Sequence, residues 1–233
     1  MQISSSLLPA RPLGTGDWVR DVLRDAILNG RLKPGERIIE AKLARELEVG
    51  ISPVREGIQK LHHLGLVSDG PGRGTYVTKL SSTDVHQIYR LRAELEALSV
   101  QYALAIPDRP GLGRLQEWAN AMIESAACKD YQRFFECDIE FHNQVCRMAG
   151  DPYLEKCLDG LTTPLFAFVL IQLKQEPMLF DFPALAGRHQ DIVDLFRLED
   201  PVQAGGEMRR IMHGFRRTVL ETLYSVTTEG NLL

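Results

Sequence analysis

Asp138 and His142 are the first pair of side chains in this sequence whose types and spacing suggest metal chemistry. They lie four residues apart in a segment with helical periodicity, so both side chains project from one face of a helix. A carboxylate and an imidazole placed in this way can chelate one divalent cation. Two ligands do not complete a site, and two further histidines, His189 and His213, lie in later segments. A solvated acidic helix face is the alternative interpretation of Asp138.

A second chemical signal is the uneven distribution of charge along the chain. Residues 1–79 contain 12 basic and 9 acidic side chains, a formal charge of +3, whereas residues 80–233 contain 15 basic and 22 acidic ones, a formal charge of −7. A basic head on an acidic body is typical of a head that meets the phosphates of nucleic acid. The excess of +3 is small, so an ordinary solvated surface is the alternative.

The overall composition places the chain among globular proteins. It has 233 residues, of which 44% are hydrophobic and 25% charged, so disordered, collagen-like and rod-like chains are excluded. The longest apolar run, Leu165 to Ile171, is far shorter than the roughly 20 residues that cross a bilayer. Residues 1–14 lack a basic start and are expected to be a flexible leader without a secretory signal. Four cysteines without a CxxC pair predict reduced thiols in a cytosolic protein: Cys128, Cys137, Cys146 and Cys157.

The elements expected in the head follow the order of a winged helix-turn-helix. Apolar residues recur at helical spacing in three stretches, and Ser52 before Pro53 is expected to cap the third helix. Two short β-like runs flank a Gly/Pro loop and predict a hairpin. The same order of elements also occurs in protein-interaction modules. The expected elements are helices at 18–29, 40–47 and 52–64, a turn at 33–36, and strands at 66–68 and 75–77.

In a winged helix-turn-helix, the third helix enters the major groove with its N-terminal residues at the base edges. Ser52 and Arg55 open that helix here, and Arg73 lies on the glycine loop, where it can reach a phosphate or the minor groove. The alternatives are that Arg55 pairs with a surface carboxylate, that Arg45 is a solvated charge and that Thr75 is only a strand residue. The predicted DNA contacts are Arg45, Ser52, Arg55, Arg73 and Thr75.

Everything after Leu80 is helical in period, so the expected fold class is mainly α, an N-terminal winged helix-turn-helix with a C-terminal all-α helical bundle. Ser81 and Ser82 can cap the first body helix. The expected body helices are 82–105, 111–128, 130–149, 152–174, 184–198 and 201–226. The expected domains are a leader at 1–14, a DNA-binding domain at 15–79, an all-helical domain at 80–228, and a tail at 229–233.

Several motifs of the head closely resemble the GntR family of bacterial repressors. They are Leu32-Lys33-Pro34-Gly35-Glu36-Arg37, Ser52-Pro53-Val54-Arg55-Glu56 and Gly72-Arg73-Gly74, and the resemblance covers residues 18–78. The segment 89–96, Tyr-Arg-Leu-Arg-Ala-Glu-Leu-Glu, is similar to the first helix of the FadR-like subfamily, whose ligand-sensing domain is all-helical. The resemblance implies a ligand-responsive cytoplasmic regulator that binds double-stranded operator DNA as a homodimer.

The resemblance also implies a metal centre in the body. The metal-binding FadR-like domain has an Asp-x-x-x-His helix and one histidine from each of two later helices, and Asp138, His142, His189 and His213 match that arrangement. Such a set suits Zn²⁺, Ni²⁺, Mn²⁺ or Fe²⁺, among which zinc is preferred on affinity and abundance. A small carboxylate effector would bind at the open positions and pair with Arg92, with Arg90 as the alternate. The competing interpretation is that Arg92 pairs with Glu96, four residues on.

One departure from the family pattern concerns the start of the third helix. The family usually has Ser-Arg before the Thr/Ser-Pro-Val-Arg motif, where this chain has Gly50 and Ile51. Loss of one bidentate base contact removes roughly 1–3 kcal/mol of discrimination. An altered operator preference is expected, since Ile51 can still touch a thymine methyl, and weaker DNA binding is the alternative. Gly57, where the family often has alanine, lowers helix propensity.

A metal-dependent enzyme acting on a small acid is the alternative function. An open metal site can activate water, but the sequence has no nucleophile elbow, phosphate loop or HExxH motif. An enzyme would also leave the DNA-binding head unexplained. The sequence therefore predicts a regulator and not an enzyme.

Overall fold

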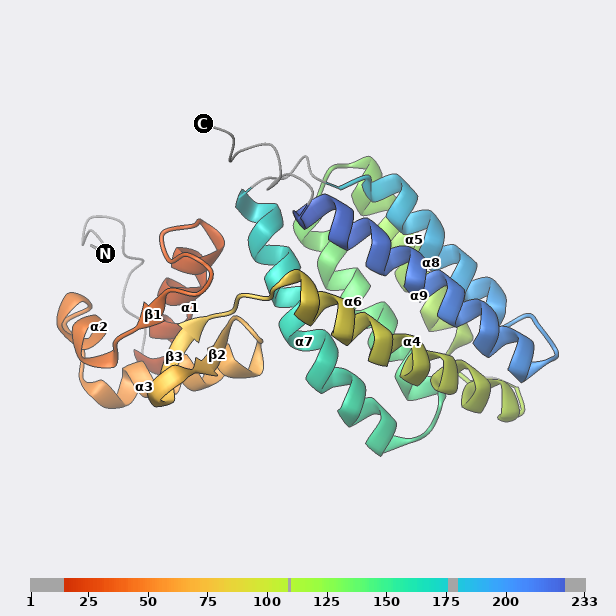
Figure 1. Cartoon of the computed structure of the whole chain (residues 1–233), viewed down its shortest axis with the longest axis horizontal. Helices are drawn as coiled ribbons and strands as arrows, with labels where there is room; N and C mark the ends of the chain where they lie inside the picture. The colour runs from red at the N-terminus through yellow and green to blue at the C-terminus, as the bar shows by residue number, and fades with distance from the viewer. Residues whose placement is uncertain (1–14, 109, 176–179, 225–233) are drawn as a thin grey trace. The chain divides into compact units, whose positions relative to one another are not determined.

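The computed structural model describes residues 15–108, 110–175 and 180–224, which are mostly helical with one small sheet (Figure 1). They divide into two compact units, one formed by residues 15–80 with 163–175 and the other by 81–162 with 180–224. A winged helix-turn-helix lies in the first and a helical bundle in the second, which confirms the predicted fold class. Within the described ranges, every helix is too short or too polar to cross a membrane. The predicted leader and tail lie outside the described residues.

The head contains three helices and a three-stranded antiparallel sheet whose strand order is β1-β3-β2. The hairpin of β2 and β3 pairs Val67 with Val77 and Gly70 with Gly74. The sequence did not predict β1, because a strand of two residues has no measurable alternation. The bounds are α1 Thr15–Leu28, β1 Arg37–Ile38, α2 Glu40–Glu46, α3 Ile51–His63, β2 Val67–Gly70 and β3 Gly74–Val77.

The third helix begins at Ile51, two residues before Pro53, which was predicted to be its first helical residue. Gly50 is its N-cap, in an extended conformation, so the expected capping role of Ser52 is wrong. Ser52 lies in the first turn instead, where its side chain is exposed. The sequence signal was ambiguous because proline lacks only an N–H, and the first four N–H groups of a helix have no partner within it. Pro53 is therefore tolerated at the third helical position as well as at the first.

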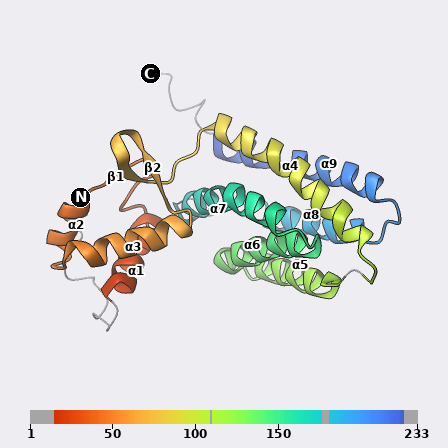
Figure 2. The same ribbon diagram turned by 90° about the horizontal axis from the view of Figure 1, so that it is seen from below.

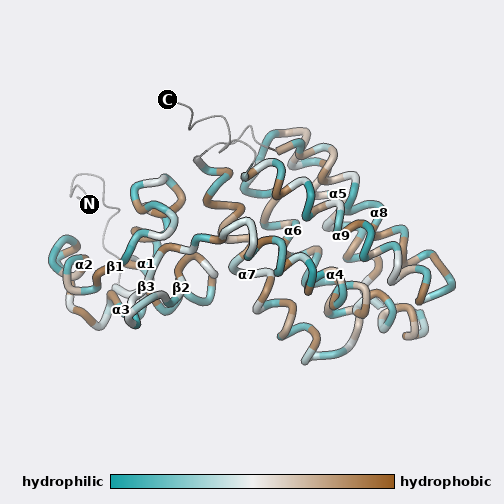
Figure 3. Tube along the Cα trace, viewed as in Figure 1, coloured by the Kyte–Doolittle hydropathy of each residue, from teal (hydrophilic) through white to brown (hydrophobic). Residues whose placement is uncertain are grey.

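The head core forms where α1 packs against α3. Apolar residues at helical spacing on both helices are fully buried, and Figure 3 shows hydrophobic and hydrophilic residues alternating along each of them. Gly57 lies where the two helices approach closely: a Cβ there would be 2.8 Å from Cγ1 of Val19 and 2.9 Å from the backbone nitrogen of Arg20. Gly57 is thus required by packing, which the sequence interpretation as a simple loss of helix propensity did not include.

The body consists of six helices along the described residues, and they lie at the predicted places with ends within three residues. Helix α4 packs along α9, and α5 packs against α6 and α8 (Figure 2). Ser81 caps α4 as predicted: its Oγ accepts a hydrogen bond from the Asp84 nitrogen, and the Asp84 carboxylate accepts one from the Ser81 nitrogen. The bounds are α4 Ser82–Ala105, α5 Leu112–Ala127, α6 Tyr131–Met148, α7 Pro152–Gln175, α8 Phe182–Leu195 and α9 Pro201–Tyr224.

The close approach at Gly57 predicts that Gly57→Ala destabilises the protein although alanine is the better helix former. The gain in propensity is about 1 kcal/mol, whereas forcing a methyl into a packed interface costs about 1–3 kcal/mol. Denaturant unfolding should therefore show a lower free energy of unfolding for the variant.

Gly206→Ala is the matched control, because Gly206 lies inside α9 and a Cβ there meets nothing within 4 Å. This substitution should raise the free energy of unfolding by up to about 1 kcal/mol. Stabilisation by both alanines would contradict the role assigned to Gly57.

Candidate metal centre and nucleic-acid interface

Three of the four predicted metal ligands meet inside the body: Asp138 and His142 on α6, and His189 on α8. Their ligand atoms all lie within 4.8 Å of one another. Asp138 Oδ1 is 2.9 Å from Nε2 of His189 and 3.4 Å from Nε2 of His142. All three side chains are buried, so this group is a compact arrangement that could hold a metal ion.

The structure does not bring the fourth predicted ligand, His213, to this group. Its side chain is exposed on α9. The buried face of α9 carries Met212 and Phe215 in its place, and the ring centroid of Phe215 is 4.9 Å from that of His189. His213 follows Met212 directly, which turns it about 100° away from the buried face.

Each histidine of the group is held at its Nδ1 atom by a hydrogen-bond acceptor. Nδ1 of His142 is 2.8 Å from Oε2 of Glu96, and Nδ1 of His189 is 2.8 Å from the carbonyl oxygen of Leu185. A carbonyl oxygen only accepts, and an ionised carboxylate also only accepts, so both Nδ1 atoms donate. The Nε2 atoms of both rings are therefore the ones that face Asp138, which is the arrangement that outer hydrogen bonds impose on metal-binding histidines.

This arrangement fits a cation. In neutral imidazoles protonated at Nδ1, the Nε2 lone pairs would face the Asp138 carboxylate, and two acceptors 2.9 Å apart repel each other. A positive charge between them, as a proton or a metal ion, removes the conflict. Two imidazoles and one carboxylate also form a donor set that binds divalent transition metals.

A buried ion pair on α4 holds His142 at its Nδ1 atom, through Glu96. Arg92 donates from Nε to Oε1 of Glu96 at 2.8 Å, and both side chains are 1% exposed. Burial raises the pKa of Glu96, but Arg92 and His142 lower it further, to about 2. The structure thus shows the pairing of Arg92 with Glu96 that the sequence left open.

The Asp138 carboxylate is ionised for a similar reason. Burial raises its pKa, but the neighbouring His189, His142 and Arg92 outweigh burial, and the net pKa is lowered. Phe141 closes the group from α6, with its ring centroid 5.1 Å from that of His189 and 5.6 Å from that of His142. Aromatic walls reduce the local dielectric constant and so strengthen the electrostatic interactions inside the group.

In the head, the residues predicted to meet DNA lie mostly on the surface. Arg55 is exposed at the start of α3 and donates from Nε to Oε2 of Glu40 at 2.8 Å, the surface pairing that the sequence left open. Arg45 is exposed on α2, where its Nε donates to the carbonyl oxygen of Ala41. Ile51, at the first position of α3, is 38% exposed. These side chains share the α2–α3 region of the head.

The wing carries the other two predicted DNA contacts. Between β2 and β3, Gly72 and Arg73 both have positive φ, 71° and 56°, and the Arg73 side chain is exposed. A left-handed conformation is unusual for a residue with a Cβ, and it belongs here to the tight hairpin turn. Thr75 is half-buried on β3 opposite Ile38, so it has the strand position that was its alternative.

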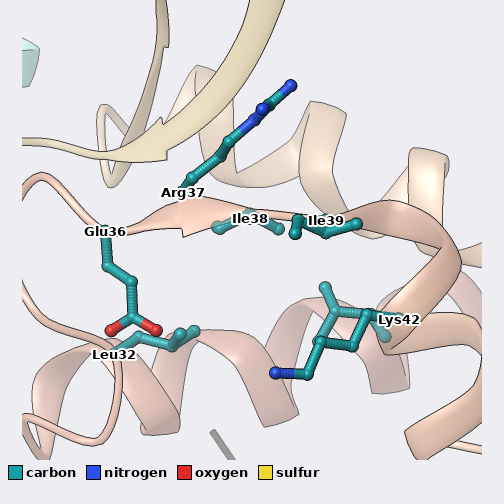
Figure 4. A pocket seen from close by; sticks show the side chains of 7 residues that line it. Leu32, Glu36, Arg37, Ile38, Ile39 and Lys42 are labelled. Atoms are coloured by element: carbon teal, nitrogen blue, oxygen red, sulfur yellow. The ribbon is translucent and has the colours of Figure 1, made fainter.

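The head also has a small hollow between β1 and α2 (Figure 4). Its wall is mostly apolar, and Arg37 points away from it. The Glu36 carboxylate accepts a hydrogen bond from the Lys33 nitrogen at 3.0 Å, which closes the predicted turn at 33–36. Because its carboxylate is used by the turn, we assign no ligand to the hollow. The lining residues are Leu32, Glu36, Arg37, Ile38, Ile39, Lys42 and Leu43.

Comparison with models of protein families shows the family to which this chain belongs. Residues 15–77 match the model of bacterial regulatory proteins of the gntR family, and residues 87–214 match the FCD domain. The chain is a GntR-family regulator with an FCD domain. The family consists of transcriptional regulators and not of enzymes, as predicted from the sequence.

This GntR-family regulator is similar to several bacterial proteins. YdhC of Bacillus subtilis strain 168, an uncharacterized HTH-type transcriptional regulator, is 33% identical over 131 residues, which are 52% of this chain and 58% of YdhC. McbR of Escherichia coli K12, an HTH-type transcriptional regulator, is 27% identical over 61% of this chain and 65% of McbR. The gluconate operon repressor of Bacillus subtilis is 25% identical over 83% of this chain and 82% of the repressor.

A solved structure of Escherichia coli McbR/YncC superimposes with a TM-score of 0.66 at 20% identity, covering 93% of this regulator and all of that chain. At that identity the likeness speaks for the fold alone. The matched regions span less than two thirds of YdhC and McbR.

Two residues around the candidate metal centre in the FCD domain were missed by sequence reasoning. Glu96 was considered only as a partner of Arg92, and its bond to His142 joins residues 46 positions apart. Phe215 was missed because the sequence interpretation selected His213, two residues earlier. Spacing alone does not determine which face of α9 turns inward. The apolar stripe of α9 was the one signal that could have shown it.

The buried ion pair predicts that Glu96→Gln strongly destabilises the regulator. Removing the carboxylate charge leaves the Arg92 guanidinium buried without its counter-charge, which costs about 3–5 kcal/mol. The free energy of unfolding, measured with denaturant on chelator-treated protein, should fall by that amount.

Glu94→Gln provides the comparison on the same helix, because Glu94 also pairs with an arginine, Arg209, at 2.8 Å but on the surface. Exposed pairs contribute about 0–1 kcal/mol. If the two variants lose equal free energies of unfolding, the buried Arg92–Glu96 pair contributes no more to stability than the surface pair does.

Proposed function

We propose that this chain is a ligand-responsive transcriptional regulator that acts in the cytoplasm and binds double-stranded operator DNA as a homodimer. In this proposal residues 15–79 bind DNA, and residues 80–228 dimerise and sense a small carboxylate. The observation that carries the proposal is the buried Asp138–His142–His189 group inside an FCD domain that follows a gntR-type head. A group of this kind is costly to bury unless a bound cation or proton balances its charge.

The head would read DNA with the start of α3 in the major groove. Arg55 and Ser52 lie exposed there, and Arg45 is exposed on the preceding helix. Ile51 offers an apolar contact that suits a thymine methyl group in place of an arginine contact to guanine. In the wing, Arg73 would reach a phosphate or the minor groove, and Thr75 would support the strand beside it. The expected consequence is an operator preference that differs from that of relatives with arginine at the position of Ile51.

In the body, Asp138, His142 and His189 would hold one divalent ion. Zinc is the first choice, with nickel, manganese and iron as alternatives, because imidazole and carboxylate donors suit all four. Such an ion supplies coordination positions at which an oxygen of a small carboxylate can bind. One relative is named the gluconate operon transcriptional repressor, and gluconate is a small carboxylate, which supports this ligand class.

The proposed function is tested by DNA binding in solution. Fluorescence anisotropy with the promoter region of the regulator's own gene should show sequence-selective binding, and an unrelated duplex of equal length serves as the control. A panel of small carboxylic acids, each with and without added Zn²⁺, should contain an acid that shifts the DNA affinity. Equal binding to both duplexes at every salt concentration would refute the operator-binding role.

The wing geometry predicts that Arg73→Ala weakens binding to every DNA sequence by a similar factor. A lost phosphate contact reduces the slope of log affinity against log salt by about 1. Arg55→Ala should cost about 1–3 kcal/mol and relax the preference at one base pair. Anisotropy titrations at several salt concentrations, with operator and single-base variants, measure both effects.

Arg114→Ala is the control for these substitutions, because Arg114 lies on α5 of the body and pairs with Glu117 on the surface. It should leave the affinity and the salt slope unchanged. An Arg73→Ala variant with the wild-type slope would exclude Arg73 from phosphate contact.

A further inference from the structure

We propose that α9 contributes no metal ligand in this regulator, so that the ion is held by Asp138, His142 and His189 alone. Phe215 then closes the α9 side of the centre, and the remaining coordination positions are left to water or to an oxygen of a small carboxylate. The inference rests on the metal centre of the proposed function and specifies its donor set. It departs from the four-ligand arrangement that the sequence predicted.

The rotation of α9 determines which of its residues faces the group. Met208, Met212, Phe215 and Val219 recur at spacings of three and four and are all buried, so they form the inward face. His213 lies off this face and is exposed. Bringing it inward would require a rotation of about 100°, which would carry Met212 out of the core.

Contacts on both sides hold α9 in this rotation. On one side, Arg209 donates to Oε2 of Glu94 at 2.8 Å, and Gly205 approaches α4 so closely that a Cβ would lie 2.9 Å from Cδ of Gln101. On the other side, Arg188 of α8 donates to Oγ1 of Thr218 at 2.7 Å. A rotation that delivered His213 would break these contacts with both neighbouring helices.

Phe215 is the residue of α9 whose ring packs against the two histidines. Its ring centroid is 4.9 Å from that of His189 and 6.5 Å from that of His142, and the side chain is 5% exposed. An aromatic ring has no lone pair for an ion, so this side of the centre is a wall and not a donor. Two imidazoles and one carboxylate remain, a set known for leaving open positions on the ion.

The donor set can be tested with the metals alone, on the full-length chain after removal of bound metal by a chelator. The affinities for Co²⁺ and Zn²⁺ are measured by competition with a chromophoric chelator, and the visible absorption of Co²⁺ reports the ligands. His213→Ala should leave both affinities within about twofold, whereas His189→Ala should weaken them by about a hundredfold or more. Both histidines lie on body helices, so comparing the two variants distinguishes a metal ligand from a histidine outside the centre.

Phe215→His is the constructive test, because it places a nitrogen donor where the ring now stands. It should tighten Co²⁺ binding by about tenfold or more, the scale on which single changes around a centre alter affinity, and should change the visible spectrum. Phe215→Leu keeps an apolar side chain, so its affinity should stay close to wild type. Thermal unfolding followed by circular dichroism confirms that each variant is folded.

Two results would overturn the inference. One is a tenfold or larger loss of affinity in His213→Ala, which would make His213 a ligand. The other is a folded Phe215→His variant with unchanged affinity and spectrum. If the wild-type chain binds neither metal, or binds them no more tightly than His189→Ala does, these residues form no metal centre. DNA binding, measured separately, would then decide whether the regulatory function survives.

Discussion

The packing of the FCD domain around its centre depends on the balance of charge among five buried polar groups. Asp138 and Glu96 are ionised carboxylates, and Arg92 supplies one positive charge. Without a further cation the group would have a net negative charge in a wall of aromatic rings, which is an unfavourable environment for an unpaired charge. A cation at the Nε2 atoms of the two histidines would balance this charge, and the group could hold a metal ion there.

This requirement links helices that are distant in the sequence. Glu96 and Arg92 come from α4, Asp138 and His142 from α6, and His189 from α8. A change in the charge or coordination at the centre therefore acts on three helices at once. Helix α4 is also the first helix after the head, since it begins at Ser82, directly beyond the Ser81 cap. Arg92 and Glu96 therefore lie on the same helix that directly follows the head.

The sequence predicted those parts of the molecule that depend on local spacing. Asp138 and His142 share a helix, so their common face follows from the helical repeat alone, and the body helices follow from periodicity and from breaks such as Gly150-Asp151-Pro152. Whether His213 or Phe215 faces the centre depends on the rotation of α9, which its neighbours α4 and α8 determine. The bond between His142 and Glu96 likewise joins two helices, and no local pattern reveals it. Gly57 shows the same limit in the head, because its role depends on the approach of α1.

The head shows how a changed turn can alter recognition without altering the fold. Gly50 takes the N-cap position with no side chain to satisfy the helix, and Ile51 follows where the family usually has arginine. In the proposed DNA complex, polar reading of bases at this end of α3 would depend chiefly on Arg55, together with Ser52. The side chain of Arg55 is 69% exposed, and its bond to Glu40 is a surface ion pair that contributes about 0–1 kcal/mol. DNA can therefore displace Glu40 at little cost, and until then Glu40 limits the orientations that the guanidinium adopts. In this proposal, the arginine missing at position 51 would leave the polar reading to Arg55, which the Glu40 carboxylate already positions.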